Sequence, residues 1–184
     1  MLLKLAVLFA SCLICLSLAA PKAPQETYYV WLFDYDWTTC FSYATTDKSM
    51  VYHGTSSRRN CYSMIGIGPT SCTGPNVGAE GNASVKPTPN KGATLVYGQF
   101  YSCADVTCPK GFHCEEIQYG GGICCNSQYW EFSNEGHSEK CPDGSDAPKL
   151  NGMIQIAHNC RNIKCGDGQK CVVVNKYFAK CCKA

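Results

Sequence analysis

The sequence lacks the features that mark most enzymes and most proteins that bind nucleic acid. Its 184 residues carry 16 basic and 14 acidic side chains, a formal net charge of +2. A balance this even does not recruit nucleic acid or an anionic membrane surface. No G-x-S-x-G turn or other nucleophile motif is present. We therefore expect a protein that is not an enzyme and that uses no cofactor.

Patterns that bind metal ions are also missing. The chain has four histidines: His53, His113, His137 and His158. None has a partner at zinc spacing, and no cysteine pair after residue 19 follows the C-x2-C pattern of zinc ribbons and thioredoxin-type sites. Asp143 and Asp146 stand near a glycine, but the 12-residue calcium loop around such acids is absent. We expect no metal site.

Long hydrophobic runs are absent except at the N-terminus. Residues 1–19 combine one early lysine, an apolar run and small residues before Pro21, which is typical of a secretory signal peptide cleaved after Ala19. The run is shorter than the roughly 20 apolar residues of a spanning helix, and no second run follows. We therefore expect a secreted, extracellular protein without a membrane anchor.

Cysteine, in contrast, is abundant. Of the 16 cysteines, Cys12 and Cys15 leave with the signal peptide, so 14 remain. An even number in a chain that enters an oxidising compartment indicates disulfides, here seven. The cysteines expected in disulfides are Cys40, Cys61, Cys72, Cys103, Cys108, Cys114, Cys124, Cys125, Cys141, Cys160, Cys165, Cys171, Cys181 and Cys182.

Ten of these cysteines belong to a duplicated pattern. Residues 103–125 and residues 160–182 both read C-x4-C-x5-C-x9-C-C, at a constant offset of 57 positions. Gly111 matches Gly168, and two apolar positions recur as well. The pattern predicts two copies of one small module, and each apolar run before the vicinal cysteines predicts a small hairpin.

Each copy is expected to recruit one cysteine from upstream. Cys141 serves the second copy and Cys72 the first, which leaves Cys40 to pair with Cys61; alternatively, Cys61 takes the place of Cys72. Six cysteines allow 15 pairings. Vicinal cysteines rarely join each other, so Cys124 and its neighbour should reach different partners.

These assignments divide the chain into five segments. Residues 1–19 are the signal peptide, residues 20–71 an aromatic-rich β segment, residues 72–125 the first cysteine-rich repeat, residues 126–140 a linker and residues 141–184 the second repeat. Such small units bury little apolar surface, and three disulfides at about 3 kcal/mol each supply what the core lacks. We expect a small disulfide-rich fold, mainly β, with short hairpins, much irregular loop and no large hydrophobic core.

The segment before the repeats has an unusual run of aromatic residues. From residue 29 to residue 37 every second position is aromatic, which predicts a strand with one aromatic face. Rigid rings offer a large contact area, so Trp31, Phe33, Tyr35 and Trp37 are a candidate face for a glycan or a protein partner. In the favoured alternative, three of them form the core of the N-terminal segment.

Three further sites follow from short motifs. Asn82 begins an N-x-S acceptor for glycosylation in a loop-like stretch. Arg58 and Arg59 form a dibasic pair, which we interpret as part of a solvated loop rather than a processing site. Lys110 and Lys170 are basic residues between cysteines, which a rigid loop could offer to a trypsin-like protease.

The second copy resembles a known family. Residues 141–148, C-P-D-G-S-D-A-P, together with Cys160, the C-G-D-G-Q-K-C of residues 165–171 and the final vicinal pair, are similar to the lustrin-type cysteine-rich repeat of shell-matrix and secreted nematode proteins. The first copy departs upstream, since 30 residues separate Cys72 from Cys103 against 18 in the second copy. The resemblance implies a role in an extracellular matrix or in molecular interaction, without catalysis.

Three functions are therefore considered. The first is a secreted structural or adhesive module whose partner is an extracellular protein or glycan. The second is an inhibitor of a secreted serine protease, and the third is a toxin-like or antimicrobial effector. The near-neutral charge argues against membrane attack, because anionic membranes are engaged by clustered basic residues.

Overall fold

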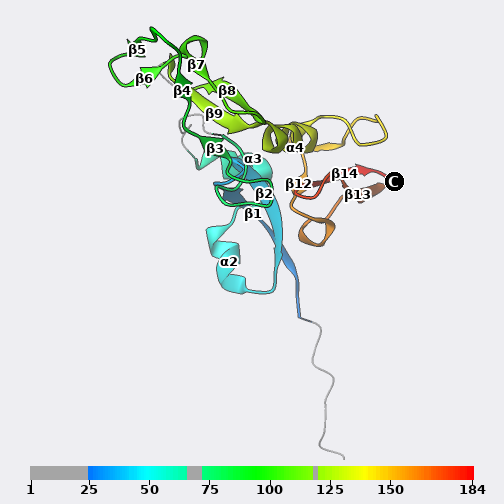
Figure 1. Cartoon of the computed structure of the whole chain (residues 1–184). Helices are drawn as coiled ribbons and strands as arrows, with labels where there is room; N and C mark the ends of the chain where they lie inside the picture. Colours follow the sequence, from blue (N-terminus) through cyan, green and yellow to red (C-terminus); the bar gives the residue numbers. More distant parts are fainter. Residues whose placement is uncertain (1–24, 66–71, 118–119) are drawn as a thin grey trace, which may run out of the picture.

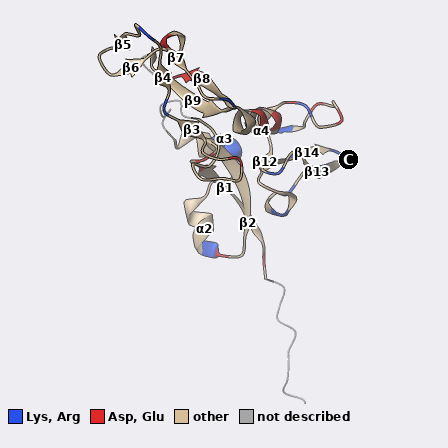
Figure 2. Cartoon of the chain, viewed as in Figure 1, with Lys and Arg blue, Asp and Glu red and all other residues tan. Residues whose placement is uncertain are grey.

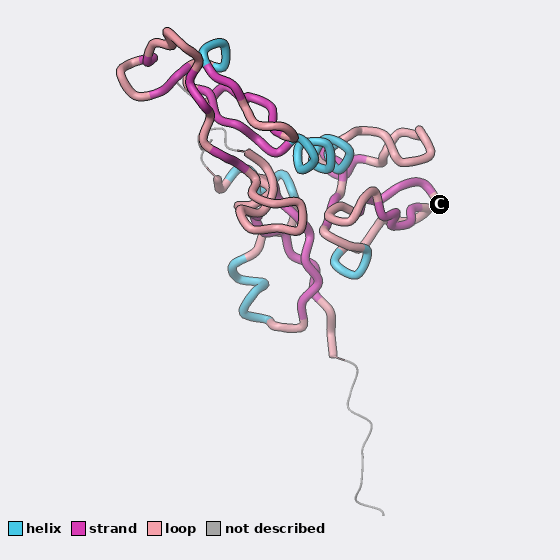
Figure 3. The backbone as a smooth tube through the Cα atoms, viewed as in Figure 1, coloured by secondary structure: helices cyan, strands magenta, loops and turns pink. Residues whose placement is uncertain are grey.

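The structure is a computed structural model that describes residues 25–65, 72–117 and 120–184 (Figure 1). The expected signal peptide, residues 1–19, lies outside the described residues. Strands in small sheets dominate, joined by much loop and few helices, and seven disulfides hold them, which confirms the expected fold class (Figure 3). In the described part of the chain, none of the helices has the length and apolar character needed to cross a membrane.

Residues 25–65, called the N-terminal unit below, contain a hairpin and two short helices. Strand β1 (Tyr28–Asp34) pairs antiparallel with β2 (Thr39–Thr45), and α2 (Lys48–His53) and α3 (Arg58–Ser63) follow. Side chains of Asp47 and Ser57 accept hydrogen bonds from the first backbone N–H groups of the two helices, which starts each helix. The Cys40–Cys61 disulfide ties α3 to β2, as expected.

The strand expected over residues 29–37 ends earlier than its aromatic pattern suggests. β1 stops at Asp34, whose Oδ1 accepts a hydrogen bond of 3.0 Å from the backbone N–H of Trp37. This contact turns the chain, so Tyr35 is left 85 % exposed while Trp37 is buried. The alternation of aromatic residues in the sequence therefore extends beyond the end of the strand and into the turn that follows it.

The two repeats have the same local structure. In the first, 3-10 helix η1 (Cys103–Asp105) precedes the hairpin of β8 (Phe112–Glu116) and β9 (Gly122–Asn126). In the second, η3 (Cys160–Asn162) precedes β13 (Gln169–Val173) and β14 (Ala179–Lys183). Every bound is shifted by the 57 positions that separate the cysteines.

Side chains of the two repeats match as well. Gly111 and Gly168 precede the first hairpin strand with φ of 87° and 70°, a region that favours glycine. Val106 and Ile163 are both buried. The recurring glycine and apolar residues therefore do the same structural work in both copies.

The disulfides of the two repeats also connect in the same order. The first repeat has the pairs Cys72–Cys125, Cys103–Cys114 and Cys108–Cys124. The second repeat has the pairs Cys141–Cys182, Cys160–Cys171 and Cys165–Cys181. The first cysteine joins the sixth, the second joins the fourth and the third joins the fifth. Cys72, rather than Cys61, is therefore the upstream cysteine of the first repeat.

The remaining strands are two residues long. The first repeat adds β3 (Ser84–Val85), β4 (Thr88–Pro89), β5 (Leu95–Val96), β6 (Phe100–Tyr101) and β7 (Val106–Thr107). The second adds β10 (Lys149–Leu150), β11 (Met153–Ile154) and β12 (Ile156–Ala157). β3, β9 and β8 form a three-stranded sheet, whereas the largest sheet has the order β1-β2-β12-β14-β13. The N-terminal unit and the second repeat thus share one sheet.

Residues 126–140, expected to be a linker, contain helix α4 (Ser127–His137). The side chain of Asn126 accepts hydrogen bonds from the N–H groups of Gln128 and Tyr129, which caps the helix. Tyr129 is fully buried, and Gly136 lies against the ring of Phe178. α4 is thus packed into the molecule.

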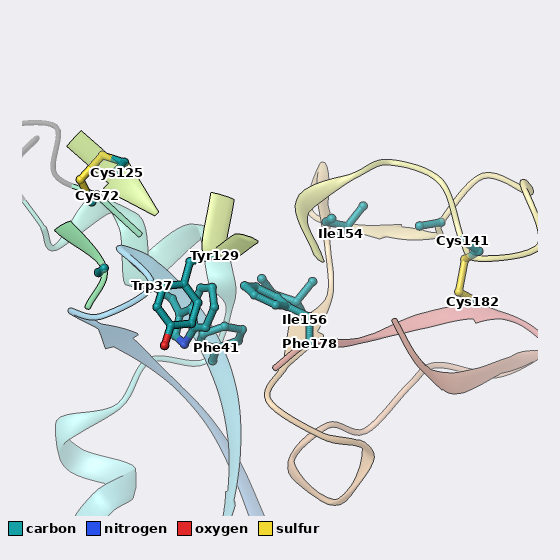
Figure 4. Close-up of a cluster of buried hydrophobic side chains, with 12 residues drawn as sticks. Trp37, Phe41, Cys72, Cys125, Tyr129, Cys141, Ile154, Ile156, Phe178 and Cys182 are labelled. Atoms are coloured by element: carbon teal, nitrogen blue, oxygen red, sulfur yellow. A yellow bond between two sulfur atoms is a disulfide. The ribbon is translucent and has the colours of Figure 1, made fainter. Parts of the chain in front are cut away.

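One cluster of buried side chains joins all of these parts (Figure 4). The Trp37 ring lies 5.8 Å from that of Tyr129, 4.8 Å from that of Tyr177 and 4.9 Å from that of Phe178, measured between centroids. Phe178 also contacts Phe41, at 5.2 Å. The aromatic run of the N-terminal unit therefore supplies the centre of a small shared core.

The close approach of Gly136 to Phe178 predicts an unusual helix substitution. A Cβ at position 136 would lie 2.2 Å from a Phe178 ring carbon. We expect Gly136→Ala to lower the free energy of unfolding by about 2 kcal/mol, although alanine favours helices, because overpacking outweighs propensity. Gly166→Ala is the matched control, since its Cβ would meet no atom closer than 3.5 Å. Urea unfolding without reductant measures both, and equal stability of the two variants would contradict the packing argument.

Candidate functional site

The extra residues of the first repeat lie in one place. Val85 pairs with Cys124, and the carbonyl of Gln155 accepts a hydrogen bond from the N–H of Cys181, the counterpart of Cys124. Val85 and Gln155 are therefore equivalent. From there the next cysteine is 18 positions away in the first repeat and five in the second. The longer connection, residues 86–102, is called the finger.

The finger is a pair of short ladders. β4 pairs with β7, and β5 pairs with β6 across a turn in which Tyr97 and Gly98 have φ of 50° and 71°. Positive φ at both central positions is the geometry of a tight hairpin turn. Phe100 lies against Gly121, where a Cβ would come within 2.7 Å of it, so the finger is seated on the β8–β9 turn. Figure 1 shows β5 and β6 at the end of the first repeat that is remote from the second repeat.

The finger carries apolar side chains that are partly or largely exposed. Leu95 is 47 % exposed, Tyr97 80 % and Phe100 39 %. None of them belongs to the shared core. Figure 2 shows that basic and acidic residues are scattered along the chain. The finger is therefore an exposed part of the first repeat that has no counterpart in the disulfide-bonded hairpin structure shared by the two repeats.

The structure separates the four aromatic residues of the candidate binding face. Trp31 is buried against the Cys40–Cys61 disulfide, and Trp37 is buried in the shared core. Phe33 is partly buried and makes an edge contact with the exposed Tyr35, 5.1 Å between ring centroids. The first two residues thus serve packing, and only the second two lie where a partner could reach them.

The two lysines proposed for protease recognition lie in different repeats. Lys110 is exposed in a tight turn, in which the Phe112 N–H donates to the Pro109 carbonyl at 3.1 Å. Lys170 is exposed in β13, where it pairs with Cys182. A cleft of about 410 Å³ lies beside Lys110 and is lined by both lysine and glutamate side chains.

Two other motif residues differ in exposure. Asn82 is exposed in the loop before β3, and its backbone carbonyl accepts a hydrogen bond from the Asn126 side chain at 3.3 Å. Its glycosylation stays a prediction. Arg58, interpreted above as part of a solvated loop, is instead buried in α3. That interpretation was wrong for Arg58, because this guanidinium finds hydrogen-bond acceptors inside the fold.

Arg58 is one of three basic side chains that meet between the units. Its Nη1 donates to the carbonyl of Ile154 at 3.0 Å, and its Nη2 donates to Thr39 Oγ1 at 3.1 Å. Burial lowers the pKa of Arg58, although Tyr62 opposes this. Its Nε is buried and has no hydrogen-bond partner in the described structure. Sequence reasoning did not identify this position as structural.

Lys180 is the second basic group, and it is fully buried. Its Nζ donates to the carbonyls of Glu135, Ser138 and Lys140 at 2.9, 2.7 and 3.1 Å. These carbonyls lie in and just beyond the last turn of α4, where the helix dipole favours a cation. Burial and the charge on Arg58 lower the pKa of Lys180 to about 8. The equivalent residue of the first repeat is Ile123, so the repeat pattern gives no signal for this lysine.

His137 is the third. Its Nδ1 contacts the carbonyl of Ser133 at 2.8 Å, and its Nε2 lies 2.9 Å from Thr39 Oγ1. Burial and the charges on Arg58 and Lys180 together lower the pKa of His137 to about 4, although the Ser133 contact raises it. Within the described residues, none of the three basic groups forms an ion pair with a carboxylate.

His158, unlike His137, lies beside a carboxylate. Nε2 of His158 lies 3.0 Å from Asp34 Oδ2, and its Nδ1 lies 3.2 Å from the Tyr177 carbonyl. Both ring nitrogens thus face oxygen acceptors, one of them a carboxylate. Burial raises the pKa of Asp34, but the contacts with His158, Trp37 and Tyr43 outweigh it and leave this pKa lowered. The pair joins β1 to the second repeat.

No group of His, Cys, Asp and Glu side chains within the described ranges could hold a metal ion. No protein-family model, no curated protein and no solved structure matches this chain. The finger and its asymmetry between the repeats are therefore the features on which a functional argument can be built.

The cap formed by Lys180 predicts a large effect of its removal. We expect Lys180→Met to lower the free energy of unfolding by about 3 kcal/mol, because the carbonyls of Glu135, Ser138 and Lys140 would lose a charged hydrogen-bond donor. Lys170→Met, on the exposed face of the neighbouring strand, should change it by less than about 0.5 kcal/mol. Thermal unfolding without reductant compares the stability of the two variants. A Lys180→Met variant as stable as the natural chain would show that the cap is dispensable.

Proposed function

We propose that this protein is secreted and acts as a non-catalytic binding module in an extracellular matrix or secretion. Its seven disulfides fit an extracellular, disulfide-stabilised protein. The resemblance of its cysteine pattern to the lustrin-type repeat supports the same role. A duplicated rigid frame suits recognition, because little conformational entropy is lost on binding.

The observation that carries the proposal is the asymmetry between the repeats. Both have the same disulfide order and the same hairpin, yet only the first carries a finger with exposed apolar side chains. A repeat folds without this segment, as the second repeat shows with its five-position connection. An exposed apolar surface that folding does not require is typical of an interaction site.

The chemistry of the finger indicates its partner. Tyr97, Phe100 and Tyr101 present rings on a short hairpin, and the neighbouring Lys86 and Lys91 add positive charge. Aromatic rings stack on sugar faces and pack against apolar protein surfaces, and they lose little rotamer entropy. The partner is accordingly an extracellular protein or glycan.

Substitutions in the finger test this proposal. We expect the double variant Leu95→Ser, Tyr97→Ser to bind at least about tenfold more weakly to the partner found among purified matrix proteins and immobilised glycans, because two exposed anchors are lost. Tyr52→Ser is the matched control, since Tyr52 is 87 % exposed on α2 and lies outside the finger. Equal binding by all three proteins would exclude the finger as the binding surface.

Protease inhibition is the alternative that a specific feature favours, namely the exposed Lys110 in a disulfide-braced turn. Substrate-like inhibition needs an extended segment, whereas this turn is closed by the Phe112 N–H to Pro109 carbonyl bond. We therefore expect no inhibition of trypsin, chymotrypsin or elastase at micromolar protein. Stoichiometric trypsin inhibition that disappears in Lys110→Ala would favour the inhibitor instead.

A further inference from the structure

The N-terminal unit is held to the rest of the molecule without a covalent bond other than the chain itself. Its one disulfide, Cys40–Cys61, is internal, and among the described residues no disulfide joins one unit to another. Strand β2 meets the second repeat through a single parallel pair, Ser42 with Ala157. Side-chain contacts at this junction therefore decide whether the units stay together.

A fully buried hydroxyl, that of Thr39, lies at the centre of this junction. It contacts Arg58 and Tyr62 of α3 and His137 of α4. A hydroxyl has one proton to donate and two lone pairs to accept. The Arg58 guanidinium has only donors, so it occupies one lone pair, and in the short contact with Tyr62 either hydroxyl can donate.

The remaining contacts fix the form of His137. Its Nδ1 faces the Ser133 carbonyl, which only accepts, so Nδ1 carries the proton. The Thr39 hydroxyl then donates to an unprotonated Nε2. With a neutral imidazole, both ring nitrogens of His137 therefore have a complementary partner. A proton on Nε2 would instead make this nitrogen a donor, so the Thr39 hydroxyl could no longer donate to it and the contacts around Thr39 would have to rearrange.

The surroundings of His137 offer no compensation for a positive charge. Arg58 faces it from α3 and Lys180 from β14, and both are cations. Tyr62 lies on α3, and the Phe178 ring lies 5.5 Å from the imidazole, measured between centroids. The carboxylate of Glu135, on the same helix, accepts a hydrogen bond from the Asn175 side chain. A third cation in this group would therefore repel the other two and break the contact with β2.

We propose that Thr39, Arg58, Tyr62 and His137 form an acid-sensitive latch, which holds the N-terminal unit against α4 and the second repeat at neutral pH and releases it when His137 takes up a proton. Each repeat keeps its three disulfides in the released state. Release exposes the aromatic residues of the shared core, including Trp37 and Phe178.

The lowered pKa of His137 determines whether the closed state loses or gains stability as the pH falls, and over which pH range. Between the ordinary value of 6.5 and about 4, the released state binds a proton that the closed state does not. Stability of the closed state is therefore full above pH 6.5 and falls as the pH drops toward 4. Asp34, whose pKa is lowered from 3.8, acts only below this window, and Lys180, with a pKa of about 8, acts above it.

The test measures unfolding of the full chain in urea, with disulfides intact, by tryptophan fluorescence between pH 7.5 and pH 4.5. We expect the unfolding equilibrium constant of the natural chain to rise roughly 100-fold over this range, from a shift of about two pH units. In His137→Gln, whose amide oxygen still accepts from Thr39, the rise should be lost. In His158→Gln, the matched control in the same junction, it should persist.

Two results would overturn the latch. The first is an unfolding equilibrium constant of the natural chain that does not change between pH 7.5 and pH 4.5, and the second is the same rise of this constant in His137→Gln as in the natural chain. If the variant does not fold, an NMR titration of the histidines in the natural chain decides. A His137 imidazole that titrates near pH 4 supports the latch, and one that titrates at pH 6.5 or above excludes it.

Discussion

The packing of Trp37 against Tyr129, Tyr177 and Phe178 is the contact on which the arrangement of the units depends. The disulfides make each repeat rigid, but they leave its position relative to the other parts free. Trp37 comes from the N-terminal unit, Tyr129 from α4, and the last two residues from the second repeat. One side chain therefore joins three segments that cysteine chemistry does not connect, and the aromatic run of the sequence finds its use in packing.

The cysteine spacing predicted the structure within each repeat. It did not predict how the units pack against one another. The cysteine pattern and its turn glycines were enough to identify two repeats, because a disulfide frame and a turn are local constraints. Helix α4 was missed because its sequence, with Gly136 and several polar residues, has weak helix propensity; burial of Tyr129 and the fit of Gly136 to Phe178 stabilise it instead. The finger was visible only as an excess of residues between Cys72 and Cys103.

The basic group around Thr39 could not have been found from the sequence at all. Arg58 and His137 lie 19 and 98 positions from Thr39, and no sequence motif links either of them to it. Arg58 was interpreted as solvated because a dibasic pair usually is, and Lys180 occupies a position where the other repeat has Ile123. Duplicated frames can thus differ most where each copy meets its neighbours, since the internal cysteines are constrained and the contact positions are not.

The vicinal cysteines give the chain a particular tolerance to damage. Successive residues of a strand point to opposite faces, so Cys124 and Cys125 hold β9 to one partner on each side, as their counterparts hold β14. A single peptide-bond cleavage within either frame therefore leaves all fragments covalently attached until a reductant is added. Cleavage between residues 126 and 140 is different, because no disulfide spans that interval among the described residues, and it would leave two disulfide-bonded pieces without a covalent link between them.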